Sequence, residues 1–196
     1  MDAGQRLFAS RSKEGVSIDE IVDAANVAKG SFYNHFSDKE SLADAIVELV
    51  QGDCEHHVFV ANQDVEDSAL RVVRALAVLI QYVTVHPDRL GALLTLTSRK
   101  VNIAAPLNAG LTHDIRQGLD SGRFSGISVE CGVLSVLGLI GTAVDFVGGD
   151  RGGIPLEQVV EEMGSVLLRG LGIEHEEASA LAHQAVELLE NLGEKS

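Results

Sequence analysis

The stretch from Ser17 to Leu42, SIDEIVDAANVAKGSFYNHFSDKESL, decides the fold of the first part of this chain. Ser17 and Glu20 have the spacing of a capping box, in which the serine oxygen accepts the Glu20 amide and the glutamate carboxylate accepts the Ser17 amide. The apolar residues that follow recur at the spacing of one helical face: Ile18, Ile21, Val22 and Ala25. The sequence therefore predicts a helix that begins directly after Ser17.

A turn and a second short helix are predicted next. Asn26 stands where the first helix would stop, and asparagine tolerates the left-handed conformation that such a stop often needs. We expect the apolar Val27 to fill the turn. The second helix would run from about Ala28 to Phe36, with Phe32 and Phe36 pointing inward because they lie four positions apart. Two short helices with a tight turn between them, the second polar on its front, are typical of a helix-turn-helix that enters the DNA major groove.

A longer run, GVSIDEIVDAANVAKGSFYNHFSDKESL from Gly15 to Leu42, resembles the DNA-binding signature of the tetracycline-repressor (TetR) family. Its most specific part is KGSFYNHFSDKESL, from Lys29 to Leu42, and the later LLRGLG from Leu167 to Gly172 is similar to the end of the family's last core helix. The resemblance implies an all-α homodimer with a three-helix DNA-binding domain and a helical ligand-binding and dimerisation domain. Such proteins are usually repressors that a small molecule releases from a palindromic operator.

The bulk composition agrees with a globular helical protein. The chain has 196 residues, 45% of them hydrophobic, with a mean hydropathy of +0.15 and only 3 prolines. We place the helix-turn-helix domain at residues 1–45 and the ligand-binding and dimerisation domain at 46–196. The polar segment from Asn62 to Asp67 is interpreted as the linker between the two domains.

The charge balance is unusual for a DNA-binding protein. The net charge is −14, which argues against nucleic-acid binding over the whole surface. Met1 to Ala45 contains eight acidic residues and five basic ones, which gives 5 − 8 = −3; the basic residues are Arg6, Arg11, Lys13, Lys29 and Lys39. We therefore expect weak non-specific binding that falls steeply as the salt concentration rises.

The acidic balance, together with a missing N-terminal arm, supports an alternative interpretation, and the chain departs from the family pattern at two places. The predicted first helix, Asp2 to Ser10 with Leu7 and Phe8 toward a core, starts later than is usual in the family, which commonly has a basic arm ahead of it. Lys13 stands where the family usually has an aromatic residue. The alternative is a TetR-like helical ligand-binding module that has lost DNA binding.

The polar front of the second helix supplies the candidate DNA contacts. Asn34 can pair with adenine, Tyr33 and His35 offer ring hydrogen bonds, and Gly30 allows close approach to the duplex. Lys29 and Lys39 are expected to contact phosphates, and Tyr33 could instead pack within the small domain. The full predicted set is Ser17, Lys29, Gly30, Ser31, Tyr33, Asn34, His35 and Lys39.

The remaining helices are predicted from their apolar periodicity. Ser37 and Glu40 could form a second capping box for a helix that runs to about Val60. Further helices are expected near residues 69–86, 88–99, 107–119, 129–147, 156–171 and 174–192, with a connection at 102–106. The helix at 129–147 is apolar nearly all round, and the helix at 156–171 is a second long apolar helix. We expect the two to form a four-helix homodimer interface, although a monomeric core would have the same pattern.

The larger domain is expected to bind an unknown small-molecule effector. Polar groups in or beside its apolar helices are the candidate contacts, and Asp145 leads because a buried carboxylate needs a partner. Each of them could equally be a surface group or a satisfied buried one. The candidates are Tyr82, His86, Thr97, His113, Arg116, Gln117 and Asp145.

The sequence contains no clear signal for redox chemistry, metal binding or catalysis. Cys54 and Cys131 are interpreted as small buried hydrophobic residues rather than a redox pair. His56 and His57 are adjacent and would point about 100° apart on a helix, so they cannot readily bind one ion together. Cys54 and His57 have the i, i+3 spacing that could bind one, but we expect no metal site. The chain has no nucleophile elbow, phosphate loop or zinc-protease motif, and we expect neither an enzyme nor a cofactor. Without a visible signal peptide or a membrane-spanning segment, we expect a cytoplasmic protein.

Overall fold

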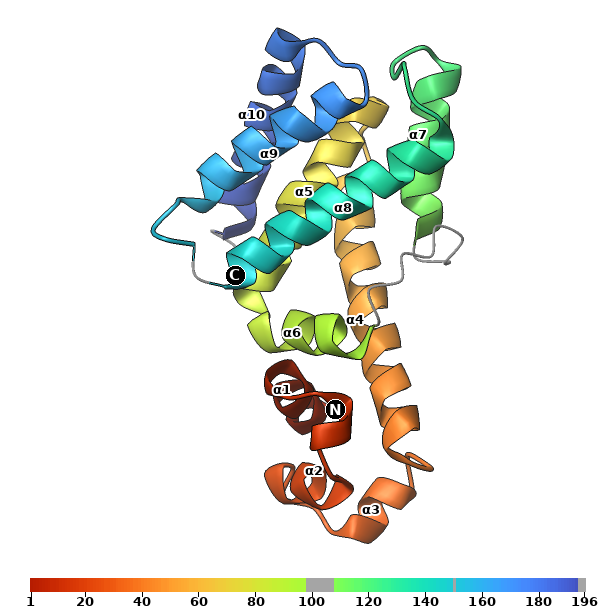
Figure 1. Cartoon of the computed structure of the whole chain (residues 1–196), viewed down its shortest axis with the longest axis vertical. Helices are drawn as coiled ribbons and strands as arrows, with labels where there is room; N and C mark the ends of the chain where they lie inside the picture. The colour runs from red at the N-terminus through yellow and green to blue at the C-terminus, as the bar shows by residue number, and fades with distance from the viewer. Residues whose placement is uncertain (98–107, 150, 194–196) are drawn as a thin grey trace. The chain divides into compact units, whose positions relative to one another are not determined.

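The computed structural model describes residues 1–97, 108–149 and 151–193, and every regular element in these ranges is helical (Figure 1). The all-α prediction is therefore confirmed. The predicted connection at 102–106 lies outside the described residues. The helices are α1 (Asp2–Ser10), α2 (Ile18–Ala24), α3 (Lys29–Tyr33), α4 (Lys39–Ala61), α5 (Ser68–Val85), α6 (Pro87–Leu96), α7 (Ala109–Asp120), α8 (Val129–Gly148), α9 (Leu156–Gly170) and α10 (His175–Gly193).

The chain divides into two compact units. Unit 1 comprises Met1–Asp53 and His86–Lys100, and unit 2 comprises Cys54–Val85 and Val101–Ser196. The chain thus passes from unit 1 to unit 2 within α4, and α6 belongs with the N-terminal helices. The sequence pattern gave no sign of this last feature, because the partner of an amphipathic helix cannot be read from its own periodicity.

Unit 1 is organised around α1. Phe8 and Ile46 are completely buried, and α6 packs on α1 so closely that a methyl group at Gly91 would lie 2.9 Å from the Ala9 Cβ. A glycine at this position therefore allows the two helix backbones to approach each other. Arg89 of α6 also pairs with Asp53 of α4, which ties α6 to a third element of the same unit.

The segment from Asn62 to Asp67 is not a linker between the units, since both of its ends lie in unit 2. Asn62 is only 2% exposed, and its amide donates to the Arg71 carbonyl at 3.0 Å. In return Arg71 Nη1 donates to the Asn62 carbonyl at 3.1 Å. The linker prediction was wrong because a polar, mostly exposed segment can connect two helices of one unit, here α4 and α5, as well as two domains.

Unit 2 is built around α5, which packs against α7, α8, α9 and α10. Its apolar residues include Val72, Leu76 and Ile80, each at most 1% exposed. α9 and α10 lie side by side (Figure 1), and Gly164 on α9 faces Val73 and Ala182 at a distance that a side chain would not permit. The close approach of the helices accounts for a core made largely of valine, leucine and alanine.

Long-range ion pairs join the elements of unit 2. Arg71 Nε on α5 donates to Asp114 Oδ1 on α7 at 2.7 Å. Arg123 makes two hydrogen bonds of 2.8 Å to Asp67 and one of 2.6 Å to Glu177. The hydrogen bond from Arg123 lowers the pKa of Asp67 below its usual value, against the opposing effect of partial burial.

Two helices of unit 2 are long and apolar enough to cross a membrane, by length and composition alone. They are α5, with a mean hydropathy of 1.5, and α8, with 1.8. The uncharged stretch in α8 is shorter than the helix itself, which begins and ends with charged turns. Core helices of globular proteins pass the same test, and both helices here pack against neighbouring helices of unit 2.

Three local predictions for these helices need correction. Cys131 is exposed and Cys54 is half-buried, so neither is the fully buried residue that their apolar neighbours suggested.

Helix α4 is capped by Asp38 rather than Ser37, and the partner is Ser41 rather than Glu40. The Ser41 amide donates to Asp38 Oδ1 at 2.7 Å, and the Asp38 amide donates to Ser41 Oγ at 3.3 Å. Both registers suit a capping box, and the sequence does not choose between them.

Candidate functional site

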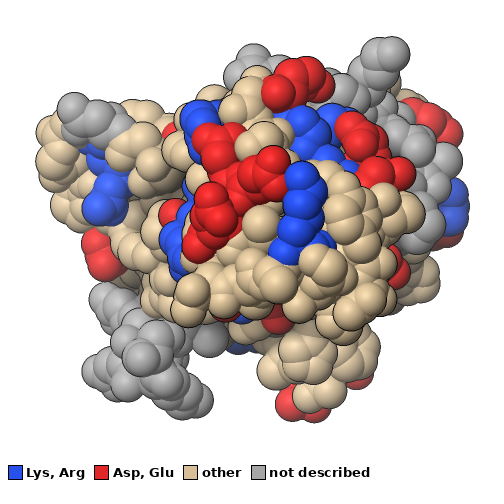
Figure 2. Space-filling model, turned by 90° about the horizontal axis from the view of Figure 1, so that it is seen from below, with Lys and Arg blue, Asp and Glu red and all other residues tan. Residues whose placement is uncertain are grey.

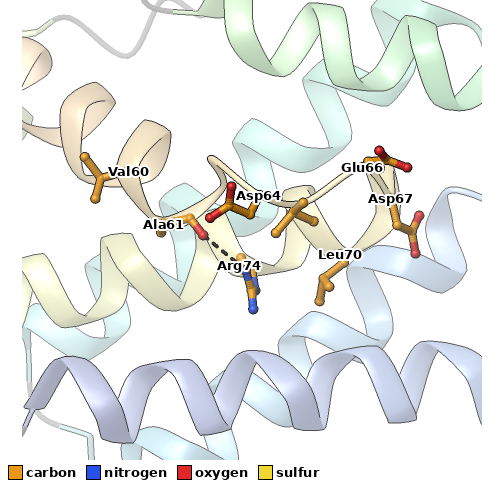
Figure 3. Close-up of a pocket in the computed structure, with 8 residues that line it drawn as sticks. Val60, Ala61, Asp64, Glu66, Asp67, Leu70 and Arg74 are labelled. Carbon is orange, nitrogen blue, oxygen red and sulfur yellow. Dashed lines mark hydrogen bonds between the residues drawn. The ribbon is translucent and has the colours of Figure 1, made fainter.

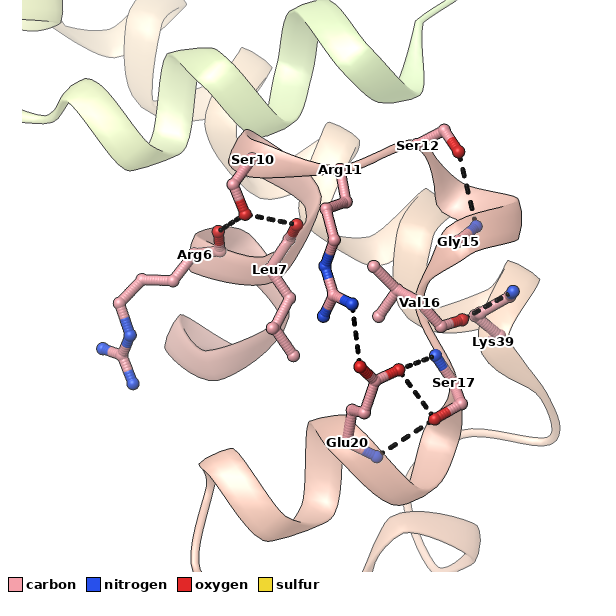
Figure 4. Close-up of polar contacts among 10 residues, drawn as sticks. All are labelled: Arg6, Leu7, Ser10, Arg11, Ser12, Gly15, Val16, Ser17, Glu20 and Lys39. Atoms are coloured by element: carbon pink, nitrogen blue, oxygen red, sulfur yellow. Dashed lines mark hydrogen bonds and ion pairs between the residues drawn. The ribbon is translucent and has the colours of Figure 1, made fainter.

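The capping box at the start of α2 is formed as predicted. The Ser17 amide donates to Glu20 Oε2 at 2.9 Å, and the Glu20 amide donates to Ser17 Oγ at 3.2 Å (Figure 4). Arg11 Nη1 donates to the other carboxylate oxygen at 2.8 Å. The Ser17 amide and then Arg11 lower the pKa of Glu20 from 4.5 to about 2. The Ser17 hydroxyl also donates to Glu20, so this predicted DNA contact is already used within the protein.

The turn between α2 and α3 has the left-handed residue that was predicted. Asn26 has φ +52°, and the Val27 amide closes the turn by donating to the Val22 carbonyl at 3.0 Å. The Val27 side chain, however, is 46% exposed and does not fill the turn. The last predicted member of the apolar face, Ala25, is exposed as well. The turn is therefore held by backbone hydrogen bonds and not by an apolar plug.

Helix α3 is shorter than predicted but presents the expected two faces. Phe32 is buried, and its ring lies 5.4 Å from that of Tyr33 and 5.6 Å from that of Phe36. Tyr33 is nevertheless 51% exposed, so its contact with Phe32 leaves about half of the residue open to solvent. A Cβ at Gly30 would meet nothing within 4 Å. The exposed residues are Lys29, Gly30, Ser31, Tyr33, Asn34 and His35.

Lys29 at the start of α3 forms an ion pair across the turn. Its Nζ lies 2.6 Å from Asp19 Oδ1 in the first turn of α2, with more than half of each side chain exposed. The hydrogen bond and the charge of Asp19 raise the pKa of Lys29. Lys29 therefore lies at the predicted interface, but its ammonium group is already paired with the Asp19 carboxylate.

Lys39, the first residue of α4, also has a partner inside unit 1. Its ammonium donates to the Val16 carbonyl at 2.8 Å, just before α2 begins (Figure 4). The side chain is half-buried. Lys39 therefore connects the start of α4 to the start of α2, and it fixes the spacing of the elements on either side of α3.

Acidic residues accompany most cations of the N-terminal segment. Arg11 pairs with Glu20, Lys29 with Asp19, and Lys13 Nζ lies 3.9 Å from Glu40. On the face seen in Figure 2, lysine and arginine atoms lie beside aspartate and glutamate atoms. Arg6 on α1 is exposed, and within the described residues its side chain has neither an ion pair nor a hydrogen bond. The acidic balance is visible in the sequence, but the individual pairs are not, because they join residues 9 to 27 positions apart.

The predicted effector contacts do not gather around one cavity. Tyr82 is buried, with its ring 5.5 Å from that of His57. The others in unit 2 are all exposed: His113, Arg116 and Gln117 on α7, and Asp145 on α8. Asp145 is thus not the buried carboxylate that its apolar neighbours suggested. His86 and Thr97 belong to unit 1, where the Thr97 hydroxyl donates to the Leu93 carbonyl at 2.6 Å.

A hollow of about 520 Å³ lies where the chain enters α5 (Figure 3). Its lining combines apolar side chains with three carboxylates and one guanidinium: Val60, Ala61, Asp64, Val65, Glu66, Asp67, Leu70 and Arg74. Arg74 Nη1 donates to the Ala61 carbonyl at 3.1 Å, and its Nε is buried without a partner in the described residues. None of the predicted effector contacts lines this hollow.

Helices α8 and α9 leave apolar side chains uncovered. Leu134 and Phe146 on α8 are 42% and 39% exposed, and Val166 on α9 is 49% exposed. A Cβ at Gly138 or Gly141 would meet nothing within 4 Å. Leu134, Gly138 and Gly141 share one side of α8, and the described part of the chain leaves this side partly exposed, as a helix-packing surface would be.

The sequence similarity to known proteins lies in the N-terminal part of the chain. Residues 1–46 match the family model described as bacterial regulatory proteins, tetR family. The repressor DhaR of Mycobacterium sp. (strain GP1) is 32% identical over 76 residues, which cover 39% of this chain and 37% of DhaR. The alignment thus spans little more than a third of this curated relative.

Solved structures extend the likeness to most of the chain, at the level of the fold. A tetR family regulator from Shewanella sp. PV-4 has a TM-score of 0.73 at 17% identity and covers 86% of this chain and 94% of its own. AibR in complex with isovaleryl coenzyme A and operator DNA has a TM-score of 0.66 at 21% identity, with 83% and 92% covered. The first 46 residues are therefore similar to the DNA-binding segment of the tetR family of bacterial regulatory proteins, and the chain shares the helical fold of solved regulators of that family.

Proposed function

We propose that the chain is a homodimeric transcription regulator that binds double-stranded operator DNA through α3. The observation that carries the proposal is the two-faced α3, buried at Phe32 and exposed at its polar front, within the segment that matches the family model. Such a helix can present hydrogen-bonding side chains to base edges in the major groove. A cytoplasmic location is part of the proposal, since the operator would be there.

The proposal includes release of the operator by a small molecule. The relative DhaR is named a repressor, and the AibR structure contains both isovaleryl coenzyme A and operator DNA. An effector bound in unit 2 would need to favour a spacing of the two α3 helices other than the roughly 34 Å between successive major grooves. A preference of a few kcal/mol is enough to shift such an equilibrium.

Operator binding can be tested with duplexes from the upstream region of the gene. The Asn34→Ala variant should lose about tenfold or more in affinity for the preferred duplex, because one bidentate base contact is worth about 1–3 kcal/mol. The matched control is Gln184→Ala on the exposed face of α10 in unit 2. Fluorescence anisotropy at several salt concentrations gives the affinities, and a protein without a salt-sensitive preference for any palindrome would contradict the proposal.

The dimer is proposed to form through α8 and α9. The exposed Leu134 and Val166, together with the open space at Gly138, suit a second copy of the same surface. In analytical ultracentrifugation the wild type should be a dimer, and Leu134→Glu should be a monomer. Val27→Glu removes an equally exposed apolar residue from unit 1 and should remain a dimer. If Leu134→Glu is as dimeric as this control, the interface lies elsewhere.

A second candidate function is a helical ligand-binding module without DNA binding. The ion pairs that occupy Arg11 and Lys29, together with the net charge of −14, favour it. It predicts no binding to any duplex even at low salt, while native mass spectrometry of the purified protein would find a co-purified small molecule. Detection of that molecule alone fits both candidates, so the duplex titration decides between them.

A further inference from the structure

The carboxylate of Asp19 holds the only lysine of α3. Asp19 lies in the first turn of α2, and its Oδ1 is 2.6 Å from the ammonium of Lys29. Both side chains are more than half exposed, so the pair lies on the surface of unit 1 and not in its interior. A phosphate that bound the Lys29 ammonium would therefore come close to this carboxylate.

We propose that Asp19 competes with the DNA phosphates for Lys29 and thereby limits how tightly the chain binds any duplex. The inference rests on the proposed DNA-binding function and specifies how its strength is set. Lys29 can neutralise a phosphate only after it leaves Asp19. While the pair persists it is neutral as a whole, so it contributes nothing to the release of counterions that drives such binding.

A comparison with Glu20, the next carboxylate along α2, shows why Asp19 is free to compete for Lys29. Glu20 accepts the Ser17 amide and pairs with Arg11, so its removal would disturb the start of α2. Lys29, by contrast, is the partner that the described residues provide for the Asp19 carboxylate. An exposed pair of this kind contributes little to folding, and its partners exchange readily. Asp19 can therefore be changed with little effect on the fold.

The central experiment compares Asp19→Asn with wild type on a duplex of random sequence. The variant should bind about three- to tenfold more tightly at about 50 mM salt, with a dependence on log salt steeper by about 0.9. This slope corresponds to one additional phosphate neutralised, so the advantage should shrink about threefold at about 200 mM salt. Fluorescence anisotropy with a labelled duplex measures both quantities, and far-UV circular dichroism checks that the variant is folded.

Two further variants separate the pair from a general charge effect. Asp23→Asn removes the same charge one turn along α2, from an exposed residue without an ion pair in the described part of the chain. It should give a smaller gain and an unchanged salt slope. In a Lys29→Met background, Asp19→Asn should gain no more than Asp23→Asn does, because the lysine for which Asp19 competes is gone.

The possible results distinguish the inference from the function on which it rests. If wild type binds the duplex and Asp19→Asn binds no more tightly than Asp23→Asn, the function stands and the inference is wrong. Weaker binding by Asp19→Asn would also overturn it, since Asp19 would then be a DNA contact, for example to cytosine N4. If neither wild type nor Asp19→Asn binds any duplex at low salt, the proposed function itself fails.

Discussion

The ion pairs around α2 and α3 join residues 9 to 27 positions apart, whereas the arginine ion pairs of unit 2 join residues 43 to 56 positions apart. Ser17 and Glu20 are three positions apart, and Arg11 and Glu20 are nine apart. Arg71 and Asp114 are 43 apart, and Arg123 and Asp67 are 56 apart. The short-range contacts fix the ends of short helices, while the long-range pairs determine which helices lie together in unit 2.

The two groups also differ in their exposure to solvent. The Lys29–Asp19 pair is 52% and 68% exposed, whereas Arg71 and Asp114 are 27% and 9% exposed. Exposed pairs are screened and contribute little, but a buried charge that loses its partner is costly. An exposed pair such as Lys29–Asp19 should therefore exchange readily for a ligand such as phosphate, whereas the Arg71–Asp114 pair should be required for stability.

The largest expected effect comes from breaking a long-range pair. Asp114→Ala should destabilise the protein by about 2–3 kcal/mol, because Arg71 would retain a half-buried charge with only backbone carbonyls as partners. Asp120→Ala on the same helix removes an exposed carboxylate and should stay within about 0.5 kcal/mol of wild type. Urea unfolding followed by circular dichroism measures both. Equal stabilities for the two variants would remove the contrast between the units.

A smaller effect is expected at the turn of unit 1. Asn26→Ala should cost about 1 kcal/mol, because alanine disfavours the left-handed conformation that Asn26 adopts at φ +52°. Asn26→Gly should be close to neutral, since glycine adopts this conformation without a steric penalty. Thermal unfolding of the two variants side by side tests the prediction. A similar loss in both would mean that the Asn26 side chain, rather than its backbone conformation, matters.

The smallest effect should appear in the pH dependence of unit 1. The pKa of Glu20 is about 2 in the folded chain and 4.5 in its ordinary state, so its charged form stabilises the fold at and above pH 4.5. This stabilisation should be lost progressively as the pH falls from 4.5 toward 2. Glu20→Gln keeps the capping geometry but cannot titrate. The difference in unfolding free energy between wild type and Glu20→Gln should therefore shrink over this range, and a constant difference would contradict the assignment.

Much of the candidate interface could be predicted because its determinants are local. The capping box at Ser17, the left-handed Asn26 and the buried Phe32 each depend on spacings of a few residues. Two local predictions were wrong, namely that Val27 fills the turn and that Ser37 caps α4. The turn at Val27 closes by backbone hydrogen bonds alone, and Ser37 and Asp38 are both acceptable caps.

The effector contacts could not be predicted in the same way. A polar residue in an apolar helix can face solvent or another helix, and the sequence of that helix does not distinguish the two. Asp145 and Asp114 illustrate this point: both interrupt amphipathic helices, yet Asp145 is exposed and Asp114 is buried against Arg71. The burial of Asp114 could not be predicted because its partner, Arg71, lies on α5, 43 positions earlier.

The sequence by itself determined the helical class, the approximate bounds of most helices and the two faces of α3, because helix periodicity and capping operate within a few residues. Only the tertiary structure decided that α6 packs on α1, that the chain changes units within α4, and that Lys29 is held by Asp19. These features depend on which surfaces meet when the chain folds, and such contacts are set by shape and charge across the whole unit and not by neighbours in the sequence.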